Sequence, residues 1–201
     1  MSLKLNSSGG GSVTLQEATT ATNGTLTLPA GTGTVAVNGL SSNIVSGTAQ
    51  ASTSGTSIDF TSIPSWVKRV TVIFNGVSTN GTSDVIVQLG TTSGFTTSGY
   101  LGASMTFVGA NNPGSTALTS GFLVRLGGAA TATAVRHGTV ILNLLGSNIW
   151  SGAVNVGLSD VIYMASAAGT ISLADVLTQV RITTVGGANT FDAGSINILY
   201  E

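Results

Sequence analysis

The chemistry-bearing side chains of this chain are few and far apart in the sequence. His137 is the one histidine, so any Ser–His–Asp arrangement would have to use it. No G-x-S-x-G pattern is present to hold a nucleophilic serine at a strand-to-helix turn. The neighbours Arg136 and Gly138 place His137 in a loop before an expected strand. We therefore interpret His137 as an exposed loop side chain without a catalytic role.

The carboxylates are also dispersed. Glycoside hydrolysis needs two carboxyl groups about 5 to 10 Å apart, one on each side of the scissile bond. Here single acids fall within expected strands or beside turns, where an aspartate commonly bonds its own backbone. The acidic residues are Glu17, Asp59, Asp84, Asp160, Asp175, Asp192 and Glu201. Because their spacing indicates no acid–base pair, we expect a protein that is not an enzyme.

No pattern in the sequence indicates a bound phosphate, metal or cofactor. The glycine pairs Gly127-Gly128 and Gly186-Gly187 do not belong to a G-x-x-x-x-G-K loop. The calcium-binding EF-hand pattern is absent. The chain has no cysteine, which excludes thiolate metal sites and disulfides. We expect no cofactor and no metal.

Two stretches offer side chains that could contact a sugar. Trp150 lies in a polar sequence, 146–152, where an exposed indole could stack on a sugar ring, although core packing is the favoured interpretation. The run Asn111-Asn112-Pro113-Gly114 is typical of a loop tip, and a plain turn explains it equally well. The candidate receptor-binding residues are Asn111, Asn112 and Trp150. Trp66, which follows Pro64, is predicted to lie in the core or at the end of a sheet.

The composition indicates a protein that associates with its own copies. Charged residues make up 6% of the chain, against roughly 25% in an average soluble domain. Apolar residues make up 42%, and the formal net charge is −1. A neutral domain so poor in lysine and glutamate tends to self-associate. We therefore expect much of the surface to be buried in a permanent assembly.

The same numbers argue against two classes of partner. Binding to nucleic acid depends on a basic patch that neutralises phosphates, and the six basic residues are scattered. They are Lys4, Lys68, Arg69, Arg125, Arg136 and Arg181. No apolar run approaches the ~18 residues of a membrane span, and no secretory signal is visible. We expect no nucleic acid, no membrane insertion and synthesis in a cytoplasm without export by that route.

The stretch from Ser65 to Leu89 organises the expected fold. Its alternating apolar residues surround Asn80-Gly81, a dipeptide typical of a type I′ hairpin turn, which needs positive φ at both central residues. A two-residue turn there fixes the register of the two strands. The predicted pairs are Val72 with Leu89, Phe74 with Val87 and Gly76 with Val85.

Alternation continues to the C-terminus and predicts an all-β chain. Turn signals separate the apolar runs every 8 to 15 residues or so, a spacing typical of a sandwich or jelly roll. The expected strands are Ile58–Phe60, Lys68–Val77, Ser83–Leu89, Leu101–Val108, Gly121–Leu126, Thr139–Leu145, Val154–Leu158, Asp160–Ala165, Leu177–Val185 and Ser195–Tyr200. The fold class is therefore a jelly-roll-like β-sandwich over residues 57–201.

A smaller module is expected before the sandwich. Residues 1–11 are typical of a short anchor and a flexible Gly/Ser joint, and three short alternating pieces follow around residues 13–15, 26–28 and 35–37. Each piece gives one face only two apolar residues, so a single copy cannot form a core, whereas three copies around an axis could. We assign residues 1–39 to an N-terminal β meander and the Ser-, Gly- and Thr-rich residues 40–56 to a linker.

Three stretches resemble bacteriophage tail-fibre and related virion-appendage proteins. They are GGSVTLQEATTATNGTLTLPAGTGTV (Gly10–Val35), IPSWVKRVTVIFNGVSTNGTSDVIVQLG (Ile63–Gly90) and TFDAGSINILYE (Thr190–Glu201). The first resembles an N-terminal module found in phage fibre and tail proteins. The other two resemble the core of a C-terminal fibre domain. The chain departs from long fibres because it has no extended repetitive shaft.

The resemblance implies a homotrimer that belongs to a virion. Its N-terminal module would bind other virion proteins, and its C-terminal domain would lie distally and meet the host surface. The expected function is that of a short tail or baseplate fibre that adheres to host surface glycans. Two alternatives stay open: a purely structural capsid fibre or decoration protein, and a spike that cleaves glycans.

Overall fold

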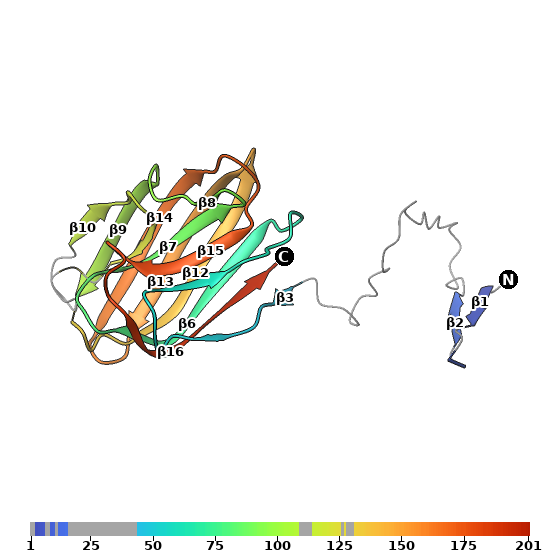
Figure 1. Ribbon diagram of the computed structural model, residues 1–201, viewed down its shortest axis with the longest axis horizontal. Coiled ribbons are helices and arrows are strands. Elements are labelled where there is room, and N and C mark those ends of the chain that lie inside the picture. The colour runs from blue at the N-terminus through green and yellow to red at the C-terminus, as the bar shows by residue number, and fades with distance from the viewer. Residues whose placement is uncertain are drawn as a thin grey trace, which may run out of the picture. The chain divides into compact units, whose positions relative to one another are not determined.

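The protein is built from β-strands, as the sequence predicts. The structure is a computed structural model that describes residues 3–6, 9–10, 12–15, 44–108, 114–125, 127 and 131–201. The chain divides into two compact units, Met1–Ser41 and Ser42–Glu201 (Figure 1). Throughout the described residues, no helix has the length and apolar character needed to cross a membrane.

Among its described residues, the N-terminal unit contains one antiparallel pair of strands, β1 (Leu3–Asn6) and β2 (Ser12–Leu15). Leu3 lies opposite Leu15, and Leu5 lies opposite Val13. The short anchor expected at the start of residues 1–11 contains strand β1, and most of the Gly/Ser joint that follows lies outside the described residues. The other alternating pieces of the predicted meander, around residues 26–28 and 35–37, lie outside the described residues.

The C-terminal unit contains two antiparallel sheets. Within the described residues the larger sheet has nine strands, in the order β10-β9-β14-β13-β12-β6-β16-β3, with β4 also paired to β16. Its strands are β3 (Val45–Ser46), β4 (Gln50–Ala51), β6 (Arg69–Thr79), β9 (Leu101–Val108), β10 (Ser115–Ala117), β12 (Arg136–Gly146), β13 (Ile149–Leu158), β14 (Tyr163–Ser172) and β16 (Phe191–Tyr200). In the larger sheet, β12, β13 and β14 form a meander of consecutive hairpins (Figure 1).

The smaller sheet has the order β11-β7-β15-β5, with β8 paired to β7. Its described strands are β5 (Ser57–Phe60), β7 (Val85–Thr91), β8 (Gly94–Phe95), β11 (Phe122–Val124) and β15 (Gln179–Thr184). Each of the ten strands predicted after residue 57 overlaps an observed strand. Strands β13 and β14 extend well beyond the predicted ends, and β8 and β10 were not predicted.

One hydrophobic cluster joins the inner faces of the two sheets. Alternate residues of the larger sheet point into it, including Val70 and Val72 of β6, which are fully buried. Val87 and Leu89 of β7 contribute from the smaller sheet and are likewise fully buried. Because each such side chain gains about 1.5–3 kcal/mol on burial, this shared layer is the main source of the fold's stability.

The predicted hairpin around Asn80-Gly81 is wrong, although both of its strands exist. Strand β6 belongs to the larger sheet and β7 to the smaller one, so Val72 pairs with Val140 and Ile198 rather than with Leu89. The residues after β6 are instead bonded to the segment before β16. The Asn80 side-chain Oδ1 accepts a hydrogen bond from the Thr190 amide at 2.9 Å, and the Asn80 amide donates one to the Thr190 carbonyl at 2.9 Å.

Gly81 is needed for space rather than for a positive φ. It is not among the residues with φ in the left-handed region, and a Cβ at this position would overlap the side-chain amide of Asn189. Asn189 accepts a hydrogen bond from the Ser83 amide through Oδ1 at 3.0 Å. These contacts direct the chain across to the other sheet, a tertiary effect that overrides the local turn signal.

The predicted linker over residues 40–56 is wrong for the part that the structure describes. Strands β3 and β4 pair with β16, with Ser46 opposite Leu199 and Gln50 opposite Ile196. The Ser52 hydroxyl donates to the Ala193 carbonyl at 2.8 Å, and Ser52 is fully buried. Residues 44–56 therefore extend the larger sheet, and the observed second unit begins at Ser42 rather than at residue 57.

We predict that Tyr100 makes the fold sensitive to alkaline pH. Its ring is buried against Phe122 at 5.3 Å between centroids, and its hydroxyl accepts from the Leu89 amide at 2.8 Å and donates to the Thr96 carbonyl at 3.1 Å. Burial raises the pKa of Tyr100 from 10.0 to about 12, against the opposing effect of the Leu89 hydrogen bond. The unfolded chain thus loses this proton first, so stability present below pH 10 is lost as pH rises towards 12.

Tyr100→Phe tests this assignment. At pH 8 the variant should be less stable by about 1–2 kcal/mol, because the Leu89 amide loses its acceptor. From pH 10 to 12 the wild type should lose on the order of 2 kcal/mol more than the variant. Urea unfolding measured at several pH values gives both quantities. A stability difference that stays constant across this range would contradict the assignment.

Candidate functional site

The candidate residue Trp150 does not face solvent. Its side chain is 2% exposed and lies among the core residues, so core packing is confirmed and stacking on a sugar is excluded. The predicted polar loop is instead a tight connection between β12 and β13. Ser147 and Asn148 form the turn with φ of 48° and 59°, the positive values that a type I′ hairpin needs. The other two candidates, Asn111 and Asn112, lie outside the described residues.

His137 is exposed, as predicted, but it belongs to strand β12 rather than to a loop. Its Nδ1 accepts a hydrogen bond from the Gly76 amide at 3.3 Å. The register of β12 against β6 shifts between Arg136 and Gly138, so His137 lies at a β-bulge. Its described contact is a hydrogen bond across the bulge to the neighbouring strand β6, and none of the described hydrogen bonds joins it to a serine.

A buried guanidinium is the main charged feature that sequence reasoning missed. Arg136 is 1% exposed, and its Nη1 donates to the Ala134 carbonyl at 3.0 Å. Burial lowers the pKa of Arg136 to about 10. The negative charges of three carboxylates act in the opposite direction and raise this pKa. They are Asp84, Asp160 and Asp192. Because these residues come from segments far apart in the sequence, spacing alone could not reveal the cluster.

The aspartates around Arg136 already have bonding partners. Asp160 accepts a hydrogen bond from the Val135 amide through Oδ1 at 3.2 Å, and Asp192 accepts one from the Ser78 hydroxyl. Among the described residues, no three His, Asp or Glu side chains lie close enough together to hold a metal ion. The arrangement balances a buried positive charge, which would be costly without nearby negative charge.

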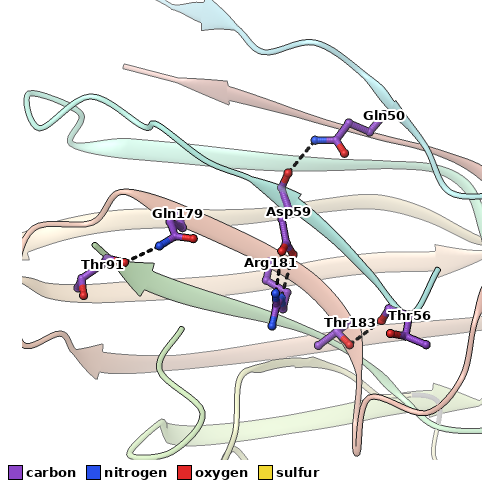
Figure 2. A network of polar contacts seen from close by, with 7 residues as sticks. All are labelled: Gln50, Thr56, Asp59, Thr91, Gln179, Arg181 and Thr183. Carbon is purple, nitrogen blue, oxygen red and sulfur yellow. Dashed lines mark hydrogen bonds and ion pairs between the residues drawn. The ribbon is translucent and has the colours of Figure 1, made fainter. Parts of the chain in front are cut away.

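The outer face of the smaller sheet carries a polar network (Figure 2). Arg181 of β15 lies directly opposite Asp59 of β5 and donates two hydrogen bonds to its carboxylate, from Nε at 2.8 Å and from Nη2 at 2.7 Å. These hydrogen bonds raise the pKa of Arg181 above its ordinary value. The guanidinium carbon also lies 4.0 Å from the centroid of the Phe95 ring. The fork and the ring together hold Arg181 in one position.

Neighbouring side chains in the network bond the backbone of adjacent segments. Gln179 donates to the Thr91 carbonyl, and Thr183 donates to the Thr56 carbonyl at 2.8 Å (Figure 2). Gln50 of β4 reaches from the larger sheet to the Asp59 carbonyl at 2.9 Å. The hydrogen bonds of the network therefore join β5, β7 and β15, Phe95 adds a ring contact from β8, and Gln50 ties the two sheets together. Its donors and acceptors are largely used within the chain, which indicates a structural role.

The outer face of the larger sheet has the opposite character. Along four adjacent strands the outward residues alternate with buried ones, and none of the outward residues named here is charged. They are Leu101, Ala103, Met105 and Phe107 of β9; Met164, Ser166, Ala168 and Thr170 of β14; Ser151, Ala153, Asn155 and Gly157 of β13; and Thr139, Ile141 and Asn143 of β12. We call this surface the uncharged face.

The uncharged face supplies about half of the area that one partner buries in a stable interface. Phe107 and Met164 lie opposite each other in the register and are 45% and 43% exposed. Strands lie about 4.8 Å apart and rise about 3.3 Å per residue, so four strands of seven residues cover roughly 400 Å² in projection. A stable interface buries about 800 Å² per partner, and an exposed patch of a few hundred Å² marks a contact site. On β6 the surface continues over Ile73 and Thr71 and ends at Arg69, which lies opposite Asn143 and is paired with Glu201.

Comparison with known proteins gives no relative for this chain. No family model matches, and neither the curated proteins nor the solved structures contain a match. The function of the protein is therefore inferred from its own residues and surfaces.

We predict that the Arg181 fork stabilises the smaller sheet through its shape as well as its charge. Arg181→Lys keeps the charge but loses the two-point hydrogen bond and the stacking on Phe95, so stability should fall by about 0.5–1 kcal/mol. The matched control is Arg69→Lys, which alters the more exposed ion pair between Arg69 and Glu201 and should cost less. Thermal unfolding measures both. Equal losses in the two variants would contradict a special role for the fork.

Proposed function

We propose that this protein is a structural subunit of a bacteriophage virion appendage, which assembles as a homotrimer through the uncharged face. The observation that carries the proposal is that this face exposes Phe107, Met164 and Ile141 among small uncharged residues. A partner that covers it must also be uncharged there, because no charged group on the face could compensate charges that the partner brings. A second copy of the chain, with the same face, meets this requirement.

The N-terminal unit gives independent support. A two-stranded antiparallel pair such as β1–β2 is at best marginally stable in water without further packing. Copies brought together by trimerisation would supply that packing, and the resemblance of Gly10–Val35 to phage attachment modules fits a unit that binds other virion proteins. The chain would be made in the host cytoplasm and would act as part of the virion.

The strand order supports the jelly-roll-like part of the proposal. From β5 to β7 the chain passes from the smaller sheet to the larger and back, and it passes between the sheets again at β9, β11, β12, β15 and β16. Repeated passage between two packed sheets is characteristic of jelly rolls. Many virion proteins use such domains, so the topology agrees with the resemblance found in the sequence.

The proposal includes adhesion of a short tail or baseplate fibre to host surface glycans. The alternative is a capsid fibre or decoration protein with a purely structural role. The broad uncharged face favours self-assembly in both cases and does not separate them. Gold labelling of the protein on intact virions, viewed by electron microscopy, distinguishes the two: label at the tail tip or baseplate supports the first, and label over the capsid supports the second.

We predict that one charge in the middle of the uncharged face disrupts the assembly. Ala153→Glu places a carboxylate between Ile141 and Ala168, its neighbours on the adjacent strands. Burying an unpaired carboxylate is strongly unfavourable, so the variant should dissociate while its subunits stay folded. Light scattering after size exclusion should give three times 19.9 kDa for the wild type and the single-chain mass for the variant.

The matched control is Val185→Glu, which adds the same charge at an exposed apolar residue, 44% exposed, at the end of the smaller sheet. This variant should keep the wild-type mass, and circular dichroism should show folded protein for all three. A wild-type protein that remains a single chain at micromolar concentration would overturn the proposed assembly. An unchanged mass for Ala153→Glu would place the interface elsewhere.

A further inference from the structure

A shallow groove lies at one edge of the C-terminal unit, and it is distinct from the uncharged face. It has a volume of about 370 Å³ and lies between the segment of β3 and β4 on one side and β5 with the residues after it on the other. Ile63, Ile198 and Tyr200 are its apolar lining residues, together with Phe60. Its polar lining includes Ser46, Thr48, Gln50, Thr61 and Ser62. Ligand sites commonly begin at about 300 Å³ and combine apolar and polar groups in this way.

Tyr200, which lines the groove, also contacts an exposed tryptophan. The ring of Tyr200 is half-buried, and the ring of Trp66 lies against it, with centroids 5.9 Å apart and planes inclined by 47°. Trp66 is 52% exposed, so the prediction of a core position is wrong and a place at the end of the sheet remains. Trp66 does not itself line the groove, but its contact with Tyr200 places an indole that is half in water next to a residue that does.

A second hollow also has Tyr200 in its lining, and it lies where the uncharged face ends at Thr71. It has a volume of about 120 Å³, and Arg69, Thr71 and Glu201 are among its lining residues. Arg69 and Glu201 form an ion pair whose side chains are 50% and 31% exposed. The Arg69 backbone is also bonded to the backbone of Glu201, at 2.8 Å and 3.0 Å. The pair therefore presents a guanidinium and a carboxylate next to Tyr200, with the backbone of both residues held by hydrogen bonds.

We propose that Trp66, Tyr200 and the two hollows that Tyr200 borders form a binding site for a neutral saccharide. The C–H face of a sugar ring packs on an aromatic face, and sugar hydroxyls bond serine, threonine and amide groups and charged forks of the Arg69–Glu201 kind. The site offers both kinds of group around the Trp66–Tyr200 pair. This inference rests on the adhesive part of the proposed function, for which it supplies the location.

The charges around the groove and the second hollow favour a neutral ligand over an anionic one. Asp59 is the one acidic residue that lines the groove, no lysine or arginine does, and both carboxylate oxygens of Asp59 are bonded to Arg181. Arg69 lines the second hollow but is paired with Glu201, so an anion would have to compete with that carboxylate.

A peptide strand is also disfavoured at this place. Strand β5 lies at the edge of the smaller sheet, where an added strand would need free backbone groups. Gln50 donates its Nε2 to the Asp59 carbonyl at 2.9 Å and thus blocks one of these groups (Figure 2). The side-chain chemistry of the groove therefore favours hydroxyl-rich ligands over an extended peptide.

The test uses the full chain and an array that displays bacterial O-antigen and capsule oligosaccharides together with short peptides. The best neutral saccharide is then titrated against the wild type, Trp66→Ala and the control Ile162→Ala. Ile162 is 89% exposed in the turn between β13 and β14, so its truncation removes apolar surface away from the Trp66–Tyr200 pair. We expect about tenfold weaker binding for Trp66→Ala and no change for Ile162→Ala.

Tryptophan fluorescence provides a readout that does not depend on a variant. Trp150 is buried and Trp66 is exposed, so saccharide binding should shift the emission to the blue and reduce quenching by acrylamide. Equal affinity of the wild type and Trp66→Ala, or fluorescence unaffected by a bound saccharide, would overturn this site while leaving the adhesive function standing. Binding of peptides in place of sugars would overturn the ligand class. No binding to any saccharide would overturn both the site and the adhesive role.

Discussion

The alternation of side chains along the strands of the larger sheet is the constraint on which the rest of the structure depends. Successive residues of a strand point to opposite faces, so Val154 and Val156 of β13 enter the core while Ala153 and Asn155 face outward. The inner layer is apolar and closes against the smaller sheet. The outer layer carries no charged residue on β9, β13 and β14, and its first charge on β6 is Arg69. The same strands thus form a stable core on one side and a surface with exposed apolar side chains on the other.

The two sheets divide these tasks between them. The smaller sheet carries Asp59 and Arg181 on its outer face. Arg181 is bonded to Asp59 and packs on Phe95, so its charge is balanced by residues of the same sheet. The larger sheet exposes Phe107 and Met164 on its outer face, and the outward residues next to them on β9 and β14 are uncharged. The two outer faces therefore differ in character: one carries an ion pair, and the other carries exposed apolar side chains among uncharged ones. The saccharide site proposed at Trp66 lies at the edge between them, near the ends of β6 and β16.

The sequence predicts the strands well and their partners less well. Alternation is a local property, and it correctly locates β6, β7 and β9 because one or both faces of each strand are buried. Which strand a given strand pairs with depends on tertiary contacts. Asn80-Gly81 is a strong local hairpin signal, yet the hydrogen bonds of Asn80 and Asn189 take the chain to the other sheet. The Ser-rich residues 44–56 have little periodicity, and they become strands because β16 offers an edge to pair with.

The candidate sites follow the same division. Burial of Trp150 could be anticipated, because its neighbours continue the alternation of β13. The exposure of Trp66 could not, because it depends on how Tyr200 and the segment after Pro64 meet at the end of the sheet. The uncharged face could be foreseen only as a shortage of charge in the composition. Its location required the register of four strands from β9 to β12.

Oxidation of Met164 by hydroxyl radicals, followed by mass spectrometry, tests the central claim most directly. Its thioether is 43% exposed in a single subunit and lies opposite Phe107 within the uncharged face. If copies of the chain cover this face, Met164 in the full-length protein should react several-fold more slowly than a methionine in an unstructured peptide. Reaction of Met164 at the rate of the peptide, at a concentration where the protein is assembled, would show that the face is open to water and contradict the account.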